Sequence, residues 1–571
     1  MALLLLLTLF PTAQFSFQSN SIPGFQTRPP SQYWVDDSAL DALQNFFRGA
    51  MAATEKSFPG KLGKINGFGA GDTYPQIWLR DSATAIPVTR YYYPSQFMTS
   101  WLEEHLAHQN RDGSLYDWIA SGKKSQFLPG APRAKEVYRS PDASSEFSIS
   151  ADKNTTEADQ ETSAVETAYW IFRIIGNRRW LTKNIDGVPL VVRLDRSLRY
   201  LLHARFDARH GLITNALTAD WGDVSPVYQD QRAIYLDART PVVVGLYTNV
   251  LFCRATAQLS ELYAALGQKN RALYWRKQTT IIKRNINRFM WQEDRGFYRM
   301  HVQVVSTGNP RFDNSNMFAM GGNGLAVLYE VASDRQAARI FDVAFKRQRE
   351  FGISTIAGVL LPPYPQGFFR HPAVSEEYTY QNGGQWDWFA GRLLLAEFER
   401  GDARRAAAQL SALAAKAKSN GGLFEWHTRD GKGMGSPNFV GSAGALAAAL
   451  YQGLFGVYLS ANSLNLKIRL AEVPARVNLF EPATERSVSY EYRYFPDQAK
   501  LSLTYQSNVP GLGEICILLP DNTEALQLLR DGNRMEFTKH TIGRDRYRCV
   551  TTDWAKHKVE LLLSNSSTRG N

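Results

Sequence analysis

From residue 36 to about residue 460 the sequence repeats one pattern, in which apolar residues recur at i, i+3 and i+4. This is the spacing of one face of an α-helix. Short joints such as Gly267–Asn270 and Gly401–Asp402 favour antiparallel helix pairs. About twelve helices are predicted, at 36–57, 82–92, 96–108, 159–176, 189–204, 240–266, 269–289, 315–331, 334–349, 384–400, 402–417 and 440–459. The pattern predicts a mainly α domain over residues 36–463.

Three joints between these helices are too long to be simple turns. They cover residues 109–158, 205–239 and 351–383, and they contain Trp, Tyr, Asp, Glu and Gly rather than the composition of a linker. Loops of this length are uncommon inside a compact domain unless they have a function. We therefore expect the functional residues in these joints.

After Leu464 the pattern changes to short strands with turn residues between them. The predicted strands cover 487–495, 500–506, 515–519 and 559–563. We predict a small C-terminal domain over 464–571 that resembles a β-sandwich. Cys516 and Cys549 lie in its strand-like stretches and are candidates for a disulfide in an exported protein, whereas Cys253 lies in a predicted helix. The spacing of the three cysteines fits no metal site, and no cofactor is indicated.

The N-terminus and the charge bear on localisation and partners. Residues 1–18 begin MALLLLLTLFPTA, which predicts a signal peptide and a secreted or periplasmic protein; a docked N-terminal tail is the alternative. Residues 19–35 are Pro- and Ser-rich and are predicted to be a linker or arm. No later stretch approaches the about 18 apolar residues of a membrane span, so we predict no integral membrane segment. The net charge of +11 comes from scattered basic residues, which predicts no nucleic-acid partner but leaves room for an acidic sugar.

The first of three acidic clusters is Tyr74–Ser82 (YPQIWLRDS), in which Arg80 and Asp81 follow an apolar run. A sugar presents hydroxyl groups and an apolar ring face, so charged groups beside an aromatic residue suit it. We expect Arg80 and Asp81 to bind adjacent hydroxyls and Trp78 to stack on the ring. The alternative is structural: Asp81 caps the following helix and Arg80 forms a salt bridge.

The second cluster is Gly211–Val224 (GLITNALTADWGDV), in which Asp220 and Asp223 flank Trp221. An indole desolvates the charged form of a neighbouring carboxyl group, so the pKa rises and the group stays protonated near neutral pH. A general acid that protonates a glycosidic oxygen needs this property. The alternative is an Asx turn beside a packed Trp.

The third cluster is Gly421–Gly441 (GGLFEWHTRDGKGMGSPNFVG), in which Glu425 lies between Phe424 and Trp426. A carboxylate that follows a Gly-Gly turn and is flanked by aromatic residues does not fit an exposed helix face. The alternative is a Glu425 that forms a salt bridge with Arg429.

Two further stretches contain candidate sugar ligands. They are YQNGGQWDW, which ends at Trp388, and ADQETSAVETAYW, which ends at Trp170. Polar groups that suit sugar hydroxyls in these stretches are Gln385, Asp387, Asp159 and Glu161. The last two also fit a helix N-terminus, where acidic groups face the positive end of the dipole.

The order of these motifs resembles the six-hairpin α/α-toroid glycosidases over about residues 36–460. Trp78–Ser82 is similar to the glucoamylase segment whose Arg-Asp pair grips the nonreducing sugar. The Asp220-Trp221-Gly222-Asp223 stretch resembles the acid loop of glycogen-debranching glucosidases and cellobiose-type phosphorylases. The segment from Glu425 to Leu446 resembles the base segment of glucoamylase, trehalase and the N-glycan-processing glucosidases. Tyr380–Trp388 is similar to stretches of the debranching, invertase and trehalase relatives.

The resemblance implies a toroid of six antiparallel helix pairs and an inverting exo-glycosidase. In that reaction Asp223 is the general acid, with Asp220 as the fallback, and Glu425 is the base. The substrate contacts implied are Trp78, Arg80, Asp81, Trp221, Gln385, Trp386, Asp387 and Trp426. An α-glucoside is the commonest substrate of the superfamily, but the fold does not fix the sugar.

The sequence departs from each named family. The longer trehalase signatures are absent, and the β domain follows the helical domain instead of preceding it. The alternatives are a phosphorylase, in which phosphate replaces water, and a noncatalytic carbohydrate-binding protein. A lyase or epimerase that uses His427 or Tyr378 is a further alternative. The partner expected is an oligosaccharide or glycoside; the oligomeric state is left open.

Overall fold

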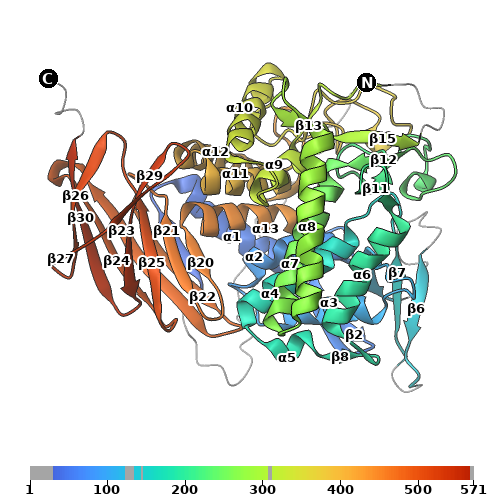
Figure 1. The fold of residues 1–571 in the computed structure, drawn as a ribbon, viewed down its shortest axis with the longest axis horizontal. Helices are drawn as coiled ribbons and strands as arrows, with labels where there is room; N and C mark the ends of the chain where they lie inside the picture. The colour runs from blue at the N-terminus through green and yellow to red at the C-terminus, as the bar shows by residue number, and fades with distance from the viewer. Residues whose placement is uncertain (1–29, 123–133, 143–145, 306–311, 566–571) are drawn as a thin grey trace, which may run out of the picture.

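The computed structural model describes residues 30–122, 134–142, 146–305 and 312–565 (Figure 1). The predicted signal peptide, 1–18, lies outside these ranges. Thirteen α-helices form within them: α1 (Ser38–Thr54), α2 (Leu79–Thr89), α3 (Gln96–Ala107), α4 (Gln160–Ile175), α5 (Arg178–Leu181), α6 (Leu190–Ala204), α7 (Leu246–Ala265), α8 (Lys269–Met290), α9 (Met320–Leu328), α10 (Asp334–Glu350), α11 (Asp387–Arg400), α12 (Ala403–Asn420) and α13 (Val440–Ala448). None of these helices is both long enough and apolar enough to cross a bilayer.

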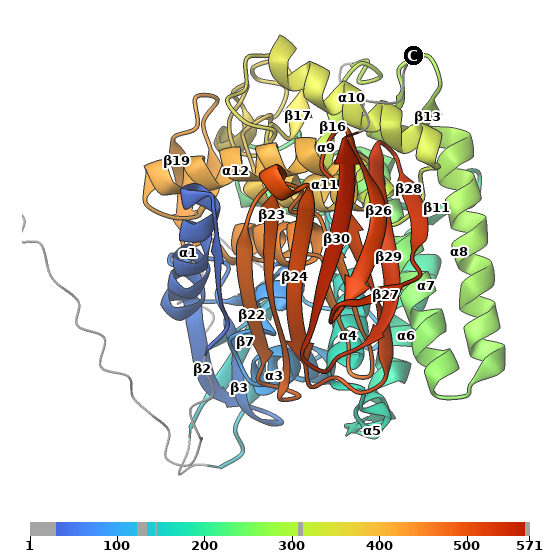
Figure 2. The ribbon, with the colours of Figure 1, turned by 90° about the vertical axis from the view of Figure 1, so that its left-hand side faces the viewer.

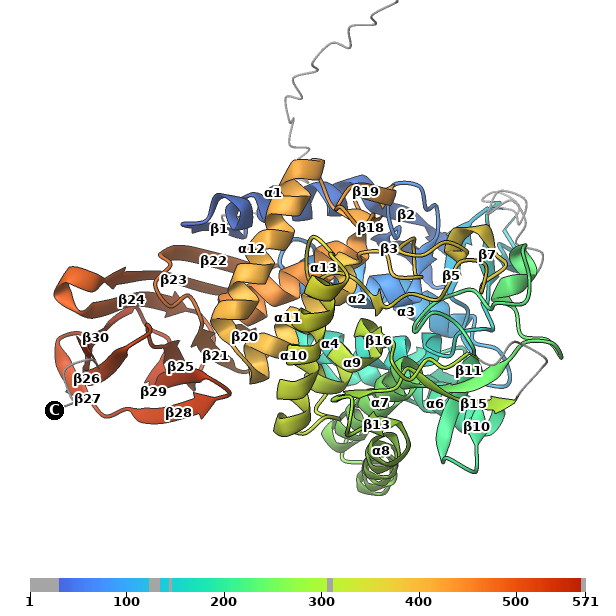
Figure 3. The same ribbon diagram turned by 90° about the horizontal axis from the view of Figure 1, so that it is seen from above.

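Six of the helices contact one another in cyclic order. Helix α2 contacts α4, α4 contacts α7, and the series continues through α9, α11 and α13 back to α2. The other long helices each pack against one or two of these six (Figure 3). The distribution of apolar residues explains why α7 is one of the six helices and α8 packs beside them. Helix α7 is buried around most of its circumference, whereas α8 buries one stripe that contains Trp275, Ile282 and Ile286.

The predicted helices are confirmed, with ends that differ by a few residues, and only the short α5 was not predicted. The largest difference is at 440–459. Here α13 ends at Ala448, a π-helical segment covers Ala449–Leu454, and Val457–Leu459 forms strand β20. Gly456 has a φ of 68°, and a Cβ atom there would lie 1.8 Å from the carbonyl oxygen of Lys467. Only glycine allows the chain to turn from helix to strand at this point.

The C-terminal region forms two sheets that lie beside the helices (Figure 2). The first has the order β1 (Gln32–Val35), β22 (Ala475–Glu481), β23 (Arg486–Phe495), β24 (Lys500–Ser507), β30 (His557–Asn565), β26 (Thr523–Arg530) and β27 (Asn533–Met535). The second has the order β20 (Val457–Leu459), β21 (Leu464–Ile468), β25 (Leu512–Leu518), β29 (Asp545–Asp553) and β28 (Thr538–Ile542). The four predicted strands are therefore present.

Segments outside 464–571 also join these sheets. Strand β1 comes from the end of the predicted linker and pairs antiparallel with β22, and β20 precedes residue 464. Cys516 and Cys549 face each other across β25 and β29 and form a disulfide. Cys253 lies in α7, in agreement with the predicted helix, and is buried there.

Smaller strands lie mainly in the joints between helices. They are β2 (Glu55–Gly60), β3 (Gly63–Phe68), β4 (Ile77–Trp78), β5 (Trp118–Ser121), β6 (Lys135–Arg139), β7 (Ser148–Asp152), β8 (Asn184–Ile185), β9 (Val188–Pro189), β10 (Phe206–Asp207), β11 (Leu212–Ala216), β12 (Val242–Gly245), β13 (Trp291–Gln292), β14 (Phe297–Tyr298), β15 (His301–Val305), β16 (Phe318–Ala319), β17 (Leu360–Leu361), β18 (Phe424–His427) and β19 (Gly433–Pro437). Several of them run directly into the starts of the cyclically arranged helices, as β4 runs into α2 and β12 into α7. Short strands thus lead the chain into the starts of several of these helices.

Candidate active site

A small open pocket, with about 360 Å³ of empty space when the solvent at its mouth is included, lies where the cyclically arranged helices begin. Its walls come from the start of α2, the loop before α7, the start of α11, the residue before α13, and strand β18. The lining residues are Ala70, Tyr74, Trp78, Arg80, Asp81, Trp221, Asp223, Tyr380, Gln381, Trp386, Trp388, Glu425 and Phe439. The three acidic clusters of the sequence, which are far apart along the chain, therefore meet in one pocket.

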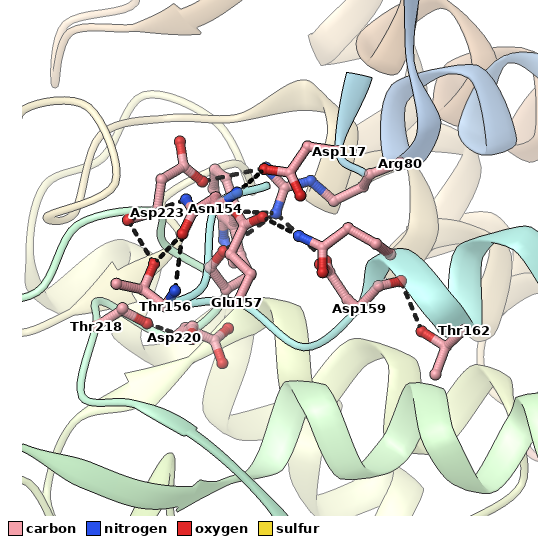
Figure 4. Close-up of polar contacts among 12 residues, drawn as sticks. Arg80, Asp117, Asn154, Thr156, Glu157, Asp159, Thr162, Thr218, Asp220 and Asp223 are labelled. Carbon is pink, nitrogen blue, oxygen red and sulfur yellow. Dashed lines mark hydrogen bonds and ion pairs between the residues drawn. The ribbon is translucent and has the colours of Figure 1, made fainter. Parts of the chain in front are cut away.

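Arg80 lies at the centre of a group of carboxylates (Figure 4). Its Nη1 atom lies 2.7 Å from Glu157 Oε1 and 3.3 Å from Asp159 Oδ2, and its Nη2 atom lies 3.1 Å from Asp223 Oδ1. The guanidinium also lies 5.7 Å from the ring of Trp221. Both Nη atoms of Arg80 therefore bind carboxylates of the protein, and Arg80 neutralises part of their negative charge.

The pKa values of Asp223 and Glu157, two of the carboxyl groups around Arg80, are shifted in opposite directions. Burial raises the pKa of Asp223, but the Arg80 guanidinium and a hydrogen bond with Glu157 outweigh it, so the pKa lies below its ordinary value. Burial, together with the negative charge of Asp223, raises the pKa of Glu157 well above its ordinary value. The expectation of a raised pKa for the carboxyl group beside Trp221 therefore does not hold for Asp223, because Arg80 lies next to it.

The main chain fixes the position of Asp223. Its N–H donates to Gln381 Oε1 at 3.1 Å, and its carbonyl oxygen accepts from Asn154 Nδ2 at 3.2 Å and from the Thr156 hydroxyl at 2.7 Å. The side chain of Asp223 is 26% exposed, whereas that of Glu157 is 8% exposed. Asp223 thus reaches the pocket and Glu157 lies behind it.

Asp220 is buried and does not line the pocket. It has a φ of 56°, and its Oδ2 atom accepts from the N–H of Gly322 at 3.0 Å, at the start of α9. In Figure 4 its carboxylate points away from the Arg80 cluster. Burial raises the pKa of Asp220 to about 7. In this loop the raised pKa expected from desolvation is therefore found at Asp220, whose carboxylate binds the N-terminus of α9.

Glu425 is held at a bulge where β18 pairs with β19. Bulges re-aim side chains beside active sites. Its Oε1 atom accepts from the Tyr74 hydroxyl and its Oε2 atom from the Ser436 N–H, both at 3.0 Å. A Cβ atom at Gly435 would lie 2.6 Å from Oε2, so glycine is needed there.

The environment of Glu425 suits a proton acceptor. Burial raises its pKa to about 7, although the hydrogen bonds from Ser436 and Tyr74 oppose this rise. The salt bridge with Arg429, the structural alternative, does not form: Arg429 binds the carbonyl oxygen of Phe351. At and above neutral pH Glu425 is therefore available as a base.

The predicted sugar contacts divide into two groups. Trp78, Arg80, Asp81, Trp221 and Trp386 line the pocket, and Asp81 lies inside the first turn of α2 and not at its cap, because α2 begins at Leu79. Burial raises the pKa of Asp81 to about 6.

The second group lies outside the pocket lining. The Gln385 side chain binds Thr355 at 2.6 Å and the carbonyl oxygens of Thr428 and Arg429, so it holds two loops together. Asp387 pairs with Lys416 at 2.6 Å in the core, and Trp426 packs against Tyr380.

The weaker candidates Asp159 and Glu161 also bind protein groups. Asp159 pairs with Arg80, as described, and Glu161 pairs with Lys153 at 2.9 Å. His427 is buried outside the pocket lining, and burial lowers its pKa to about 4.

The sequence reasoning did not single out several site residues. They are Tyr74, Glu157, Tyr380, Gln381, Trp388 and Phe439. Tyr74 begins the motif Tyr74–Ser82 and Trp388 ends the motif Tyr380–Trp388, but the sequence does not show where their side chains point. No sequence signal separates Glu157 from its acidic neighbours.

One segment of the chain matches a known family model. Residues 226–366 match the family model described as Trehalase, a segment that begins three residues after Asp223 and ends before Glu425. A comparison with curated proteins finds no match.

Three of the solved structures with a similar fold are rhamnosidases. The α-L-rhamnosidase from Dictyoglumus thermophilum has a TM-score of 0.59 and 11% identity, over 95% of this chain and 52% of that one. The GH78 family rhamnosidase of Bacillus sp. GL1 has a TM-score of 0.55 and 13% identity, over 86% and 43%. The Streptomyces avermitilis α-L-rhamnosidase complexed with L-rhamnose has a TM-score of 0.55 and 13% identity, over 93% and 42%.

This chain spans about half the length of these rhamnosidases, and at such identities the likeness shows the fold alone. The family-model match and the fold confirm the resemblance that the motifs predicted. Residues 226–366 thus match the Trehalase family model, and the chain has the fold of these rhamnosidases.

Proposed function

We propose that the chain is an inverting exo-glycosidase with Asp223 as general acid and Glu425 as general base. The observation that carries this proposal is that two carboxyl groups in different environments line one pocket. Asp223 binds Arg80 and Glu157, whereas Glu425 binds only uncharged donors. The cyclic order of the helices corresponds in this proposal to a six-hairpin toroid, and the two C-terminal sheets to a sandwich-like domain.

The reaction follows from these two groups. Asp223 gives its proton to the glycosidic oxygen as the bond to the anomeric carbon breaks and its electron pair passes to that oxygen. Glu425 takes a proton from a water molecule, whose oxygen forms the new bond on the opposite face. The product has the inverted anomeric configuration, and such enzymes hold the two carboxyl groups about 6.5–9.5 Å apart to make room for the water.

The pocket favours one neutral sugar. The pocket is small, which suits a single sugar ring more than a chain. Asp81, Asp223 and Glu425 line it against the single cation Arg80, so a negatively charged sugar meets repulsion despite the net charge of +11. An α-glucoside is the first substrate proposed, and an α-L-rhamnoside is the second because rhamnosidases share the fold.

A phosphorylase fits this pocket less well. Phosphate in place of water would need a cation near the anomeric carbon, but both Nη atoms of Arg80 already bind carboxylates. Glu425 would repel the phosphate instead. Dependence of turnover on added phosphate remains the outcome that would favour this alternative.

Export is also part of the proposal. It is supported by the Cys516–Cys549 disulfide, since disulfides persist in oxidising compartments.

Paired substitutions in one loop test the acid. We expect Asp223→Asn to lower kcat/KM for substrates with poor leaving groups by about 10²–10⁴-fold, because no other lining group replaces the proton. Asp220→Asn is the matched control: it keeps the acceptor oxygen for Gly322, so we expect a loss of less than about tenfold. The substrates are aryl and alkyl α-D-glucosides and α-L-rhamnosides. The reverse order of the two variants would assign the acid to Asp220.

Tyr74→Phe tests the base through pH. The Tyr74 hydroxyl donates to Glu425 and lowers the pKa of that carboxyl group, so its loss raises the pKa. A higher pKa leaves less of the base ionised, and the acidic limb of the rate profile moves up by about 1 pH unit. The measurement is kcat/KM from pH 5 to 9. An acidic limb that stays in place in this variant would contradict the role of Glu425.

A further inference from the structure

We propose that Glu157 is a positioning residue that shares one proton with Asp223, so that Asp223 enters the reaction protonated. The inference rests on the proposed function, since it concerns the same general acid. It explains how a carboxyl group beside a guanidinium supplies a proton.

The geometry places the two groups in one unit. Glu157 and Asp223 both bind the guanidinium of Arg80, Glu157 through Nη1 at 2.7 Å and Asp223 through Nη2 at 3.1 Å, so the two carboxyl groups are neighbours. Gln160 Nε2 donates to the other oxygen of Glu157 at 2.8 Å. Glu157 is buried behind Asp223 and does not line the pocket, so it acts on substrate only through Asp223.

The charge balance requires a retained proton. Three carboxylates, with Asp159 as the third, surround a single guanidinium. Carboxylates that share a buried site do not all ionise, because each one disfavours the charge of the next. The raised pKa of Glu157 and the lowered pKa of Asp223 agree with one proton held between the two.

Arg80 makes both positions of that proton accessible. With the proton on Glu157, the charge of Asp223 faces Nη2. With the proton on Asp223, the charge of Glu157 faces Nη1, at the shorter of the two distances. A glycosidic oxygen in the pocket accepts a hydrogen bond only from the second form and therefore favours it. After transfer both carboxylates are ionised beside Arg80, and solvent returns the proton.

Other titratable groups face the pair and contribute to its pH dependence. They are Asp81, Asp159, Glu425, Tyr74, Tyr247, Tyr380 and His371. The test therefore compares variants at a fixed pH as well as across pH.

The kinetic test is Glu157→Gln. A glutamine at 157 donates N–H to Asp223 at every pH and holds it ionised. We expect kcat/KM for alkyl glycosides, which need a proton, to fall about 100-fold, while that for glycosyl fluorides changes less than about threefold. The basic limb of the pH profile with alkyl glycosides moves to lower pH. The probes are methyl glycosides and glycosyl fluorides of α-D-glucose and α-L-rhamnose.

Asp159→Asn is the matched control. It also removes a carboxylate from Arg80, at 3.3 Å, so any loss that follows from a disturbed Arg80 affects both classes of leaving group equally. The inference would be overturned if Glu157→Gln lowered kcat/KM equally for alkyl glycosides and glycosyl fluorides. It would also be overturned if the variant left kcat/KM unchanged for both.

A second readout needs no substrate. The infrared difference spectrum of the wild type minus Glu157→Gln at pH 7 is expected to contain a protonated-carboxyl band, because Asp220, Glu425 and Glu397 contribute equally to both proteins and cancel. A difference spectrum without that band would overturn the inference even if no glycoside is turned over. If Asp223→Asn retains activity on alkyl glycosides, the proposed acid is wrong; if that variant is inactive while Glu157→Gln is normal, only the role of Glu157 fails.

Discussion

Glu425→Gln is expected to lower kcat by about 10²–10⁴-fold and to leave the protein folded. The amide keeps the shape of the side chain but does not accept the proton of the attacking water. The loss should fall on kcat more than on KM, because the interaction that is lost forms in the transition state. Since burial already raises the pKa of Glu425 to about 7, a neutral side chain costs little stability at this position.

Glu397→Gln is the matched control for a buried glutamate. Glu397 is buried in α11, burial raises its pKa to about 8, and its partner is Arg405 outside the pocket. We expect its kcat to stay within about twofold of the wild type, since it contacts no part of the site. The measurement is initial rate together with thermal unfolding. A Glu425→Gln variant with wild-type kcat and an unchanged Tm would show that Glu425 is not the base.

Arg80→Met is expected to destabilise the protein by about 3–5 kcal/mol at pH 7. The substitution leaves the buried Glu157 and Asp159 and the partly exposed Asp223 without their counter-charge, and it removes the guanidinium that packs over Trp221. Removing one partner of a buried ion pair is costly because the remaining charge has lost its solvation.

The destabilisation of this variant should depend on pH with a definite sign. Without Arg80, the pKa values of the three carboxyl groups in the folded state lie above those in the unfolded chain. Below about pH 3 the groups are protonated in both states, so their contribution to the deficit vanishes. As pH rises from about 3 to 7, the unfolded chain ionises first and is favoured, so the deficit grows.

Thermal unfolding of the wild type and the variant from pH 4.5 to 8 measures this dependence. Arg392→Met is the matched control, because Arg392 packs over Trp388 and donates to the Thr84 hydroxyl at 2.6 Å. We expect its deficit to be smaller and nearly flat with pH. A flat deficit for Arg80→Met as well would show that the three carboxylates do not depend on that guanidinium.

Periodicity predicted the helices because each helix must bury a stripe of apolar residues, and the i, i+3, i+4 spacing of that stripe is visible in the sequence. It failed at 440–459, where the helix winds into a π-segment and Gly456 turns the chain into β20. Tertiary pairing with β21 decides that end, and no local pattern records it.

One pocket is lined by Trp78, Arg80, Asp81, Asp223 and Glu425. The order of the motifs had indicated that these residues belong to one site. Sequence reasoning could not assign the partners of these residues. Whether a carboxyl group beside Trp221 is protonated depends on Arg80, which lies 143 residues from Asp223 in the chain. Gln385 and Asp387 share a motif with Trp386, but of these three residues Trp386 alone lines the pocket.

Proton NMR of the first product formed tests the central claim most directly. The wild type is incubated with aryl α-D-glucosides and α-L-rhamnosides, and the anomeric signal of the released sugar is followed before mutarotation. We predict that the first sugar released has the anomeric configuration opposite to that of the substrate, as a water activated by Glu425 requires. First release of the sugar with the configuration of the substrate would mean a covalent intermediate and would contradict the assignment of Glu425 as a base.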